Sequence, residues 1–307
     1  MREFISGILS SSGRSYKAKL LSKFKGFTMH SIPKQLYRYR SIEGEAQART
    51  QRLIETGIQY FAAPTSFNDP FDSRPDFTLS GTEDEVRAYL NEMWSRQAPH
   101  ISSEDRKREI EAILRDPNRD PRLPENSMQT AAVYEAMVTA KIGVMCLSAV
   151  RDSVLMWSHY ADCHRGICLV YDTSDEFFAT AQPVHYQHAR PQANPIAHTP
   201  EEMLDNAIFT KSDAWSYEQE WRILHYQRGP GERQMPPNCL RAVLLGVAAS
   251  DSTRRLVESW AKSSEAKPQV IRARLSPSAF EIQFPGDSGE TSQVNPHNPL
   301  ILKGGQD

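Results

Sequence analysis

Short apolar runs alternate with amphipathic stretches along most of this chain. Strand-like runs lie at 36–40, 58–63, 142–149, 166–171, 221–226, 242–247, 270–275 and 280–284. Stretches with apolar residues at helical spacing lie at 44–56, 82–97, 103–115, 127–140 and 252–262, and shorter ones begin at 152 and 199. Because strands do not alternate regularly with single helices, the pattern predicts an α+β fold rather than a repeated βαβ array.

Three of the predicted helices have recognisable ends. Thr82 with Glu85 and Thr199 with Glu202 form a capping box, in which side chain and backbone satisfy each other. Gly57 stands where the helix over 44–56 would end in a left-handed residue.

The helical stretch at about 82–140 interrupts the series of strands, so we expect it to be an insertion within a single domain spanning 31–290. Residues 1–30 form a basic N-terminal extension with six Lys or Arg residues and one acid. This extension is a lightly packed segment, an arm that contacts phosphates or a bacterial secretion leader. Residues 291–307 form a C-terminal tail.

Composition narrows the class of protein. The 307 residues include 36 Lys and Arg against 38 Asp and Glu, and 39% are hydrophobic, which excludes a polycation that coats nucleic acid. No run approaches the ~18 apolar residues of a membrane span, so we expect no membrane partner. Four cysteines without a CxxC pair favour a cytoplasmic location, with a secreted bacterial effector as the alternative.

Several familiar kinds of site are not indicated. No GxGxxG motif follows a strand and no GxxxxGK[ST] motif occurs, which argues against dinucleotide-binding and P-loop folds. His159, Cys163, His164 and Cys168 could be drawn as a zinc cluster, but Cys168 lies in an apolar strand, so we expect no metal. A thiol nucleophile at Cys146 or Cys163 would need His159 as its base.

Charged residues cluster at the start of the predicted strand at 221–226. Glu218, Glu220 and Arg222 are spaced so that they would project from one face of a strand. One interpretation is an exposed strand edge with a weak ion pair. The other is a fixed carboxylate pair that stabilises developing positive charge in a reaction.

Aromatic and polar residues gather in two further segments. Trp157, His159 and Tyr160 lie on a short helix, and Asn68 and Asp69 lie in a loop anchored by phenylalanines. The aromatic residues could simply belong to the core. Together, the two segments also offer the surfaces and hydrogen-bonding groups that a nucleotide or another planar ligand requires.

A family resemblance rests on motifs in a fixed order. These are LYRYRS, YFAAPTSFNDPFD, CLS, LMWSHYADCHRGICLVYD and K-x-x-x-W-x-Y-E-x-E-W-R. Over roughly residues 36–226 they resemble the bacterial family called Domain of Unknown Function 2971. The family carries no settled activity, so this resemblance implies no reaction.

A second resemblance is to NAD-dependent ADP-ribosyltransferases. These enzymes carry an Arg or His on the first strand, a Ser or Tyr on a middle strand and an E-x-E motif entering a later strand. Arg38 or Arg40, then Ser148, then Glu218-x-Glu220 follow this order. The segment YFAAPTS is also similar to a stretch of DarT-type enzymes, although Thr65 replaces their arginine. The resemblance implies a split, bent, mixed or antiparallel β core.

The second resemblance also implies roles. Arg38 or Arg40 would bind the phosphates or adenine-side ribose of NAD, and Ser148 would support the nicotinamide ribose. Glu220 would bond the ribose 2′-hydroxyl, and Glu218 would act as a base toward the acceptor. Further contacts to NAD are expected from Tyr60, stacked on nicotinamide, and from Asn68, Asp69, Trp157, His159, Tyr160 and Arg222.

Three functions therefore remain open. The first is an NAD-consuming ADP-ribosyltransferase or NAD glycohydrolase, which would be a bacterial defence, toxin or effector protein with a protein or nucleic-acid acceptor. The second is a hydrolase or nuclease that uses Asp69, Asp72, His159 and Glu218. The third is a non-catalytic nucleotide-sensing or interaction module in defence.

Overall fold

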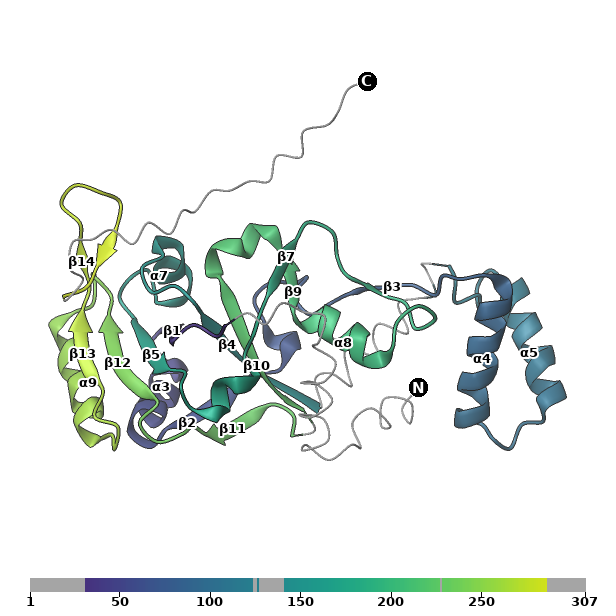
Figure 1. Cartoon of the computed structure of the whole chain (residues 1–307), viewed down its shortest axis with the longest axis horizontal. Coiled ribbons are helices and arrows are strands. Elements are labelled where there is room, and N and C mark those ends of the chain that lie inside the picture. The colour runs from purple at the N-terminus through teal and green to yellow at the C-terminus, as the bar shows by residue number, and fades with distance from the viewer. Residues whose placement is uncertain (1–30, 124–125, 127–140, 227, 286–307) are drawn as a thin grey trace, which may run out of the picture.

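A seven-stranded sheet forms the centre of the molecule (Figure 1). The structure is a computed structural model that describes residues 31–123, 126, 141–226 and 228–285. The strand order is β13-β12-β5-β1-β4-β10-β6, and only β12 and β13 run parallel. These strands are β1 (Gln35–Arg40), β4 (Ile142–Ser148), β5 (Ile167–Asp172), β6 (Gln182–Pro183), β10 (Glu220–Tyr226), β12 (Leu240–Leu245) and β13 (Gln269–Arg272).

The remaining strands form two-stranded sheets: β2 (Ile58–Phe61) with β11 (Gly231–Gln234), β3 (Asp76–Phe77) with β8 (Gln192–Ala193), β7 (His185–Gln187) with β9 (Thr210–Ser212), and β14 (Arg274–Leu275) with β15 (Ile282–Gln283). The α+β class and the mixed sheet expected from the sequence are confirmed.

The sheet opens between β1 and β4. β1 pairs with β5 along its whole length, but it meets β4 only where Tyr37 lies opposite Ser148. At the other end of β4, Val144 pairs instead with Ala62, just after β2. On the edge of β4 that faces β1, Cys146 lies between these two contacts and therefore has no strand beside it. The other edge of β4 pairs with β10.

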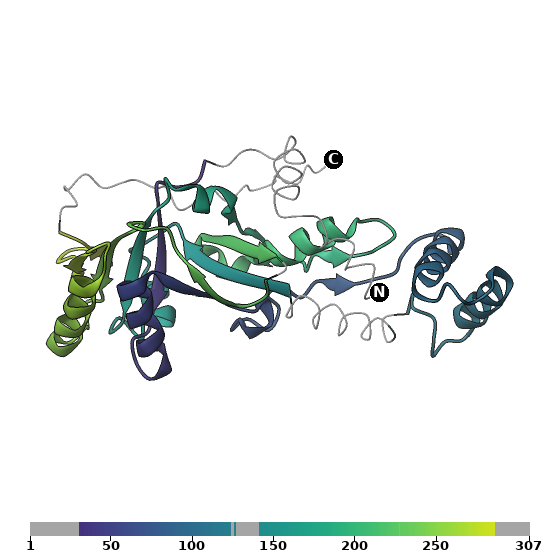
Figure 2. The same ribbon diagram turned by 90° about the horizontal axis from the view of Figure 1, so that it is seen from below.

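Helices cover both faces of the sheet. α3 (Glu45–Thr56) and α9 (Asp251–Ser263) lie on the same side, where Leu53 and Trp260 join the largest core cluster (Figure 2). The opposite face is covered by α7 (Val154–Tyr160), through Met156 and Trp157, and by α8 (Pro200–Ile208). The capping boxes that begin the helices at 83 and 200 and the left-handed Gly57 that ends α3 are as expected.

The expected insertion at 82–140 contains a helical pair that projects from the body. Figure 1 shows α4 (Glu83–Gln97) and α5 (Ser103–Arg115) side by side at the end of the molecule far from α9. They share a separate small core in which Val86 and Ile110 are buried. Residues 127–140, the N-terminal extension 1–30 and the tail 291–307 lie outside the described residues.

A short left-handed turn links α7 to β5. Asp162, Cys163 and His164 all have positive φ, at 48°, 47° and 67°, a conformation that costs non-glycine residues free energy. The turn is held because the backbone N–H of Ala248 donates to the His164 carbonyl oxygen. Gly246 allows this approach, since a Cβ there would lie 2.0 Å from the same oxygen.

Gly246→Ala should therefore destabilise the protein by at least about 2 kcal/mol, because a backbone oxygen cannot move aside like a flexible side chain. Gly44→Ala is the matched control. Gly44 has a positive φ, 56°, which Gly246 does not, but a Cβ there meets nothing within 4 Å, so we expect a loss of only about 1 kcal/mol. Urea unfolding measures both, and equal losses would contradict the proposed role of Gly246.

Candidate functional site

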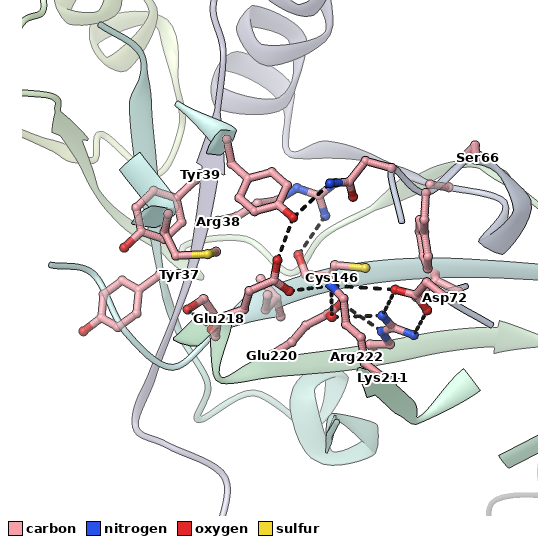
Figure 3. Close-up of a pocket in the computed structure, with 18 residues that line it drawn as sticks. Tyr37, Arg38, Tyr39, Ser66, Asp72, Cys146, Lys211, Glu218, Glu220 and Arg222 are labelled. Carbon is pink, nitrogen blue, oxygen red and sulfur yellow. Dashed lines mark hydrogen bonds and ion pairs between the residues drawn. The ribbon is translucent and has the colours of Figure 1, made fainter. Parts of the chain in front are cut away.

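A pocket of about 230 Å³ lies over the opening in the sheet (Figure 3). β1, β4 and β10 form its floor, and the loop at 66–72 forms one wall. Lys211 of β9 and Tyr160 of α7 complete the lining. The pocket therefore joins segments from most of the length of the described chain.

Arg222 is the most deeply buried charge in the pocket, with no exposed surface. Its guanidinium forms two bonds to Asp72, of 2.9 and 2.6 Å, and two to Glu220, of 2.8 and 2.9 Å. It also donates to the Ile208 carbonyl oxygen at the end of α8. Such paired forks satisfy a buried guanidinium, so Arg222 fixes the loop, α8 and β10 together.

Lys211 lies where three carboxylates meet. Its Nζ is 2.5 Å from Glu218 Oε2, 3.2 Å from Glu220 Oε2 and 3.7 Å from Asp72 Oδ2. The ammonium also lies 4.9 Å from the ring centre of Trp215, within cation–π range. Lys211 thus bridges the two glutamates of the E-x-E motif.

The buried cluster holds the carboxylates of Asp72, Glu218 and Glu220 and the cations Lys211 and Arg222. With all five ionised, it carries one excess negative charge. The pKa of Glu220 is lowered to about 2, because Arg222 and Lys211 outweigh the effect of burial. The pKa of Glu218 is raised, since burial and the charge of Glu220 outweigh Lys211 and Tyr160. Glu218 is therefore the carboxylate of the pair that is better suited to exchanging a proton near neutral pH.

Tyr160 connects Glu218 to the pocket wall. Its hydroxyl donates to Glu218 Oε1 at 2.6 Å and accepts from the Asn68 amide at 3.3 Å. Burial and the neighbouring Glu218 raise the pKa of Tyr160, so the phenol remains a donor. Figure 3 shows Glu218, which accepts this bond, joined by a dashed line to the cluster around Lys211.

A backbone kink separates Glu218 from Glu220. Glu218 ends a short 3₁₀ helix, η4 (Asp213–Glu218), and Gln219 adopts a left-handed conformation with φ 43° before β10 begins. The Ser148 hydroxyl donates to the Glu218 carbonyl oxygen at 2.6 Å. Ser148 thus holds the kink, and the two carboxylates converge on Lys211 even though only Glu220 lies in the strand.

Arg38 reaches into the opening between β1 and β4. By alternation along β1 it belongs to the face of Leu36, yet it lines the pocket and donates to the Cys146 carbonyl oxygen at 3.3 Å. Among the described residues, no carboxylate forms a salt bridge with Arg38. Its charge is available to an anionic ligand.

Seven of the twelve residues expected at the site line this pocket: Arg38, Asn68, Ser148, Tyr160, Glu218, Glu220 and Arg222. The other five do not line it: Arg40, Tyr60, Asp69, Trp157 and His159. Of the two arginines expected to bind an anionic ligand, Arg38 lines the pocket and Arg40 does not.

Two of these five residues lie away from the pocket, Trp157 fully buried and Arg40 partly exposed. Arg40 lies under α3 and donates to the Thr50 hydroxyl, and burial together with Arg38 lowers its pKa to about 10. Trp157 is fully buried beneath α7 and donates to the Arg151 carbonyl oxygen, so the interpretation of Trp157 as a core residue is correct.

The other three lie near the surface or in the loop. Tyr60 is exposed on β2 and stacks against Arg49 rather than a ligand site. His159 is exposed and bonds the Tyr217 hydroxyl at 2.9 Å. Asp69 uses one oxygen to shape its own turn.

No role is expected for Lys211 from the sequence, and Asp72 is expected only in the hydrolase alternative. Both lie inside the motifs that carry the family resemblance, Lys211 seven residues before Glu218 and Asp72 at the end of NDPFD. A buried lysine near two glutamates could have been inferred from that spacing. The interpretation of Glu218, Glu220 and Arg222 as an exposed edge is wrong, because all three are buried.

Within the part of the chain that the structure describes, the thiols and histidines do not assemble into a second site. Burial raises the pKa of Cys146 and of Cys168 well above the usual range, so neither forms a thiolate readily. Among the described residues, no three His, Cys, Asp or Glu side chains are placed to hold a metal ion. Within the same residues, no helix is long and apolar enough to cross a membrane.

The segment that carries much of this site is similar to one family model. Residues 156–223 match the family model described as Protein of unknown function (DUF2971). This stretch includes Tyr160, Lys211, Glu218, Glu220 and Arg222, so the residues matched by the DUF2971 model include the core of the pocket. No curated protein and no solved structure matches the chain. The resemblance to ADP-ribosyltransferases receives no support from these comparisons.

Removing Arg222 should be costly. Arg222→Met leaves Asp72 and Glu220 buried with only Lys211 to offset them, so we expect a loss of about 3–5 kcal/mol in the free energy of unfolding. Arg241→Met, which breaks an exposed ion pair with Asp172, is the control and should cost at most about 1 kcal/mol. Similar urea-unfolding midpoints for the two variants would show that Arg222 is not a central support.

Proposed function

We propose that this pocket cleaves the N-glycosidic bond of NAD and transfers the ADP-ribosyl group to water or to a protein or nucleic-acid acceptor. The observation that supports this best is the meeting of Arg38, Ser148 and the Glu218-x-Glu220 motif in one pocket. These residues come from a first strand, a middle strand and the entry to a later strand, in the order expected for ADP-ribosyltransferases.

In the proposed step, the bond between ribose C1′ and the nicotinamide nitrogen breaks, and its electron pair stays on that nitrogen. Nicotinamide leaves uncharged. The oxygen of water or of an acceptor bonds to C1′ and gives its proton to Glu218, from which it passes to solvent. The negative charge of the cluster stabilises the positive charge that develops on the ribose.

Glu220 has a different part from Glu218 in this proposal. Its oxygens accept bonds from two buried cations, Arg222 and Lys211, whereas those of Glu218 accept from Lys211 and the neutral Tyr160 hydroxyl. The pKa of Glu220 is accordingly lowered to about 2. Glu220 therefore stays ionised and keeps Lys211 and Arg222 in place. Ser148, whose hydroxyl bonds the Glu218 carbonyl oxygen, positions the base rather than the ribose.

The size and charge of the pocket suit one half of the substrate. Its volume, about 230 Å³, is below the ~300–1,000 Å³ of sites that enclose a drug-sized ligand. The nicotinamide-ribose half would enter, and the phosphates would meet Arg38 at the opening in the sheet. A hydrolase built on Asp69, Asp72, His159 and Glu218 is less well supported, because Asp69 and His159 do not line the pocket.

The proposal is tested by nicotinamide release. The purified protein is incubated with NAD, alone and with protein, RNA or DNA acceptors, and nicotinamide is measured by chromatography. Glu218→Gln should lower the rate at least about 100-fold, the usual contribution of a general base. Glu258→Gln, at a partly exposed position on α9, is the matched control and should keep the wild-type rate.

Two results would reject this function. One is that the wild-type protein releases no nicotinamide with any class of acceptor. If NAD nevertheless binds, the protein would be a ligand-sensing module instead. The other is an equal rate for wild type and Glu218→Gln.

The pH dependence of the same rate tests the role of Tyr160. Its hydroxyl bond favours the ionised form of Glu218, so Tyr160→Phe should raise the pKa of Glu218 further. The base is active only when ionised, and the acidic limb of the rate profile should therefore move to higher pH by about one unit. Tyr89→Phe, on α4, should leave the limb unchanged. A limb that stays in place or moves to lower pH in Tyr160→Phe would contradict this role.

A further inference from the structure

The backbone between Glu218 and Glu220 is strained and is held from two sides. Gln219, the residue between the two glutamates, has φ 43° and ψ 54°, and its side chain is exposed. A residue other than glycine keeps such a left-handed conformation only where the surrounding structure imposes it. The groups that impose it here come from β4 and from β7.

The end of β4 holds one side of this kink. The Ser148 hydroxyl donates to the Glu218 carbonyl oxygen at 2.6 Å, and the Ala149 N–H donates to the Gln219 carbonyl oxygen at 3.0 Å. These bonds hold the two carbonyl groups that precede Glu220, but not its N–H group.

The N–H group of Glu220 is held from the opposite side by a tyrosine hydroxyl. β6 pairs with β10 only at Trp221 and Arg222, and the Val184 N–H then donates to the Glu220 carbonyl oxygen at 2.8 Å. The Glu220 N–H donates to the Tyr186 hydroxyl, also at 2.8 Å. A side chain therefore stands where a continued antiparallel strand would offer a carbonyl oxygen.

Tyr186 belongs to the same strand pair as Lys211. β7 and β9 run parallel, with Tyr186 directly opposite Lys211. Tyr186 is half-buried, and burial raises the pKa of its phenol, so the hydroxyl stays neutral. Tyr186 does not line the pocket. The pair β7–β9 thus supplies both the cation that lies between the two glutamates and the hydroxyl that holds their backbone.

We propose that Tyr186 is a positioning residue for the base Glu218. Its bond to the Glu220 N–H offsets part of the cost of the left-handed Gln219 and so keeps the kink formed. The inference rests on the proposed function, in which Glu218 accepts a proton. Tyr186 acts through the backbone and touches neither NAD nor the acceptor.

Loss of this bond would change where Glu218 points, because Gln219 could then leave the left-handed region. The Glu218 carboxylate would shift from the place where Lys211 and Tyr160 hold it. A general base must lie within hydrogen-bond reach of the proton that it takes, so the rate of the chemical step depends on this placement. Binding of NAD does not depend on it.

The kinetic test is Tyr186→Phe, which removes the acceptor of the Glu220 N–H. It should lower kcat for nicotinamide release about tenfold, the effect of one lost hydrogen bond, and leave KM for NAD within about twofold of wild type. Tyr89→Phe, at another partly buried tyrosine, on α4, is the matched control and should change neither constant.

Substitution of Gln219 in the Tyr186→Phe background separates positioning from a general loss of stability. Glycine adopts the left-handed region without steric cost, so adding Gln219→Gly should restore most of the lost kcat. Gln219→Ala in the same background keeps the steric cost and should restore none.

Amide hydrogen exchange tests the bond without reference to any reaction. In the full-length protein, followed by NMR, Tyr186→Phe should speed exchange of the Glu220 N–H at least about tenfold, because that N–H loses its acceptor. The Val144 N–H, which donates to the Ala62 carbonyl oxygen, should exchange as in wild type. Tyr89→Phe should change neither amide.

The inference is overturned if the Glu220 N–H exchanges equally fast in Tyr186→Phe and in wild type. It is also overturned if an active wild-type protein and Tyr186→Phe have the same kcat, or if glycine at 219 restores no more of the rate than alanine. If the wild-type protein releases no nicotinamide, the proposed function fails by itself, since the exchange measurement still decides whether Tyr186 holds the kink.

Discussion

The buried pairing of Arg222 with Asp72 and Glu220 is the interaction on which the candidate site depends. It fixes the loop before β3 to β10 and, through the Ile208 carbonyl oxygen, to the end of α8. An isolated buried ion pair is weak evidence of stability, because desolvation offsets most of the attraction. In this protein the pairing matters because it positions other groups: it holds the carboxylates on either side of Lys211. The negative charge that remains in excess lies on Glu218.

The opening between β1 and β4 gives this charge cluster access to ligands. A continuous sheet would cover the edge of β4 with backbone hydrogen bonds, but β1 leaves β4 after Tyr37 and the next contact is at Ala62. The carbonyl oxygen of Cys146 accepts a hydrogen bond from Arg38 instead. A cation and a surplus carboxylate therefore lie in one pocket, and an NAD-like molecule, with an anionic diphosphate and a cationic ring, has both charges.

Local sequence patterns predicted most of the elements, because apolar periodicity, capping boxes and Gly57 act within a few residues of one another. They could not predict which side chains meet. Trp157 and His159 are two residues apart in α7, yet one is fully buried and the other exposed, which depends on how the helix packs. Lys211 was missed as a site residue, and Asp72 was named only for a hydrolase, because their partners belong to other elements. The order of the motifs did identify Glu218, Glu220 and Ser148 as residues that lie in one pocket. Ser148, however, bonds the backbone carbonyl oxygen of Glu218.

The separation of these partners along the chain affects how the protein is made. Asp72 and Arg222 are 150 residues apart, and α4 and α5, which can pack locally, lie between them. Contacts so distant in sequence form late, after local structure. A ribosome-bound chain that ends before η4 has neither Glu218 nor Arg222, and Asp72 in its loop has no guanidinium partner. If the pocket consumes NAD, incomplete chains are inert, and the host cell is protected from the activity until synthesis is complete.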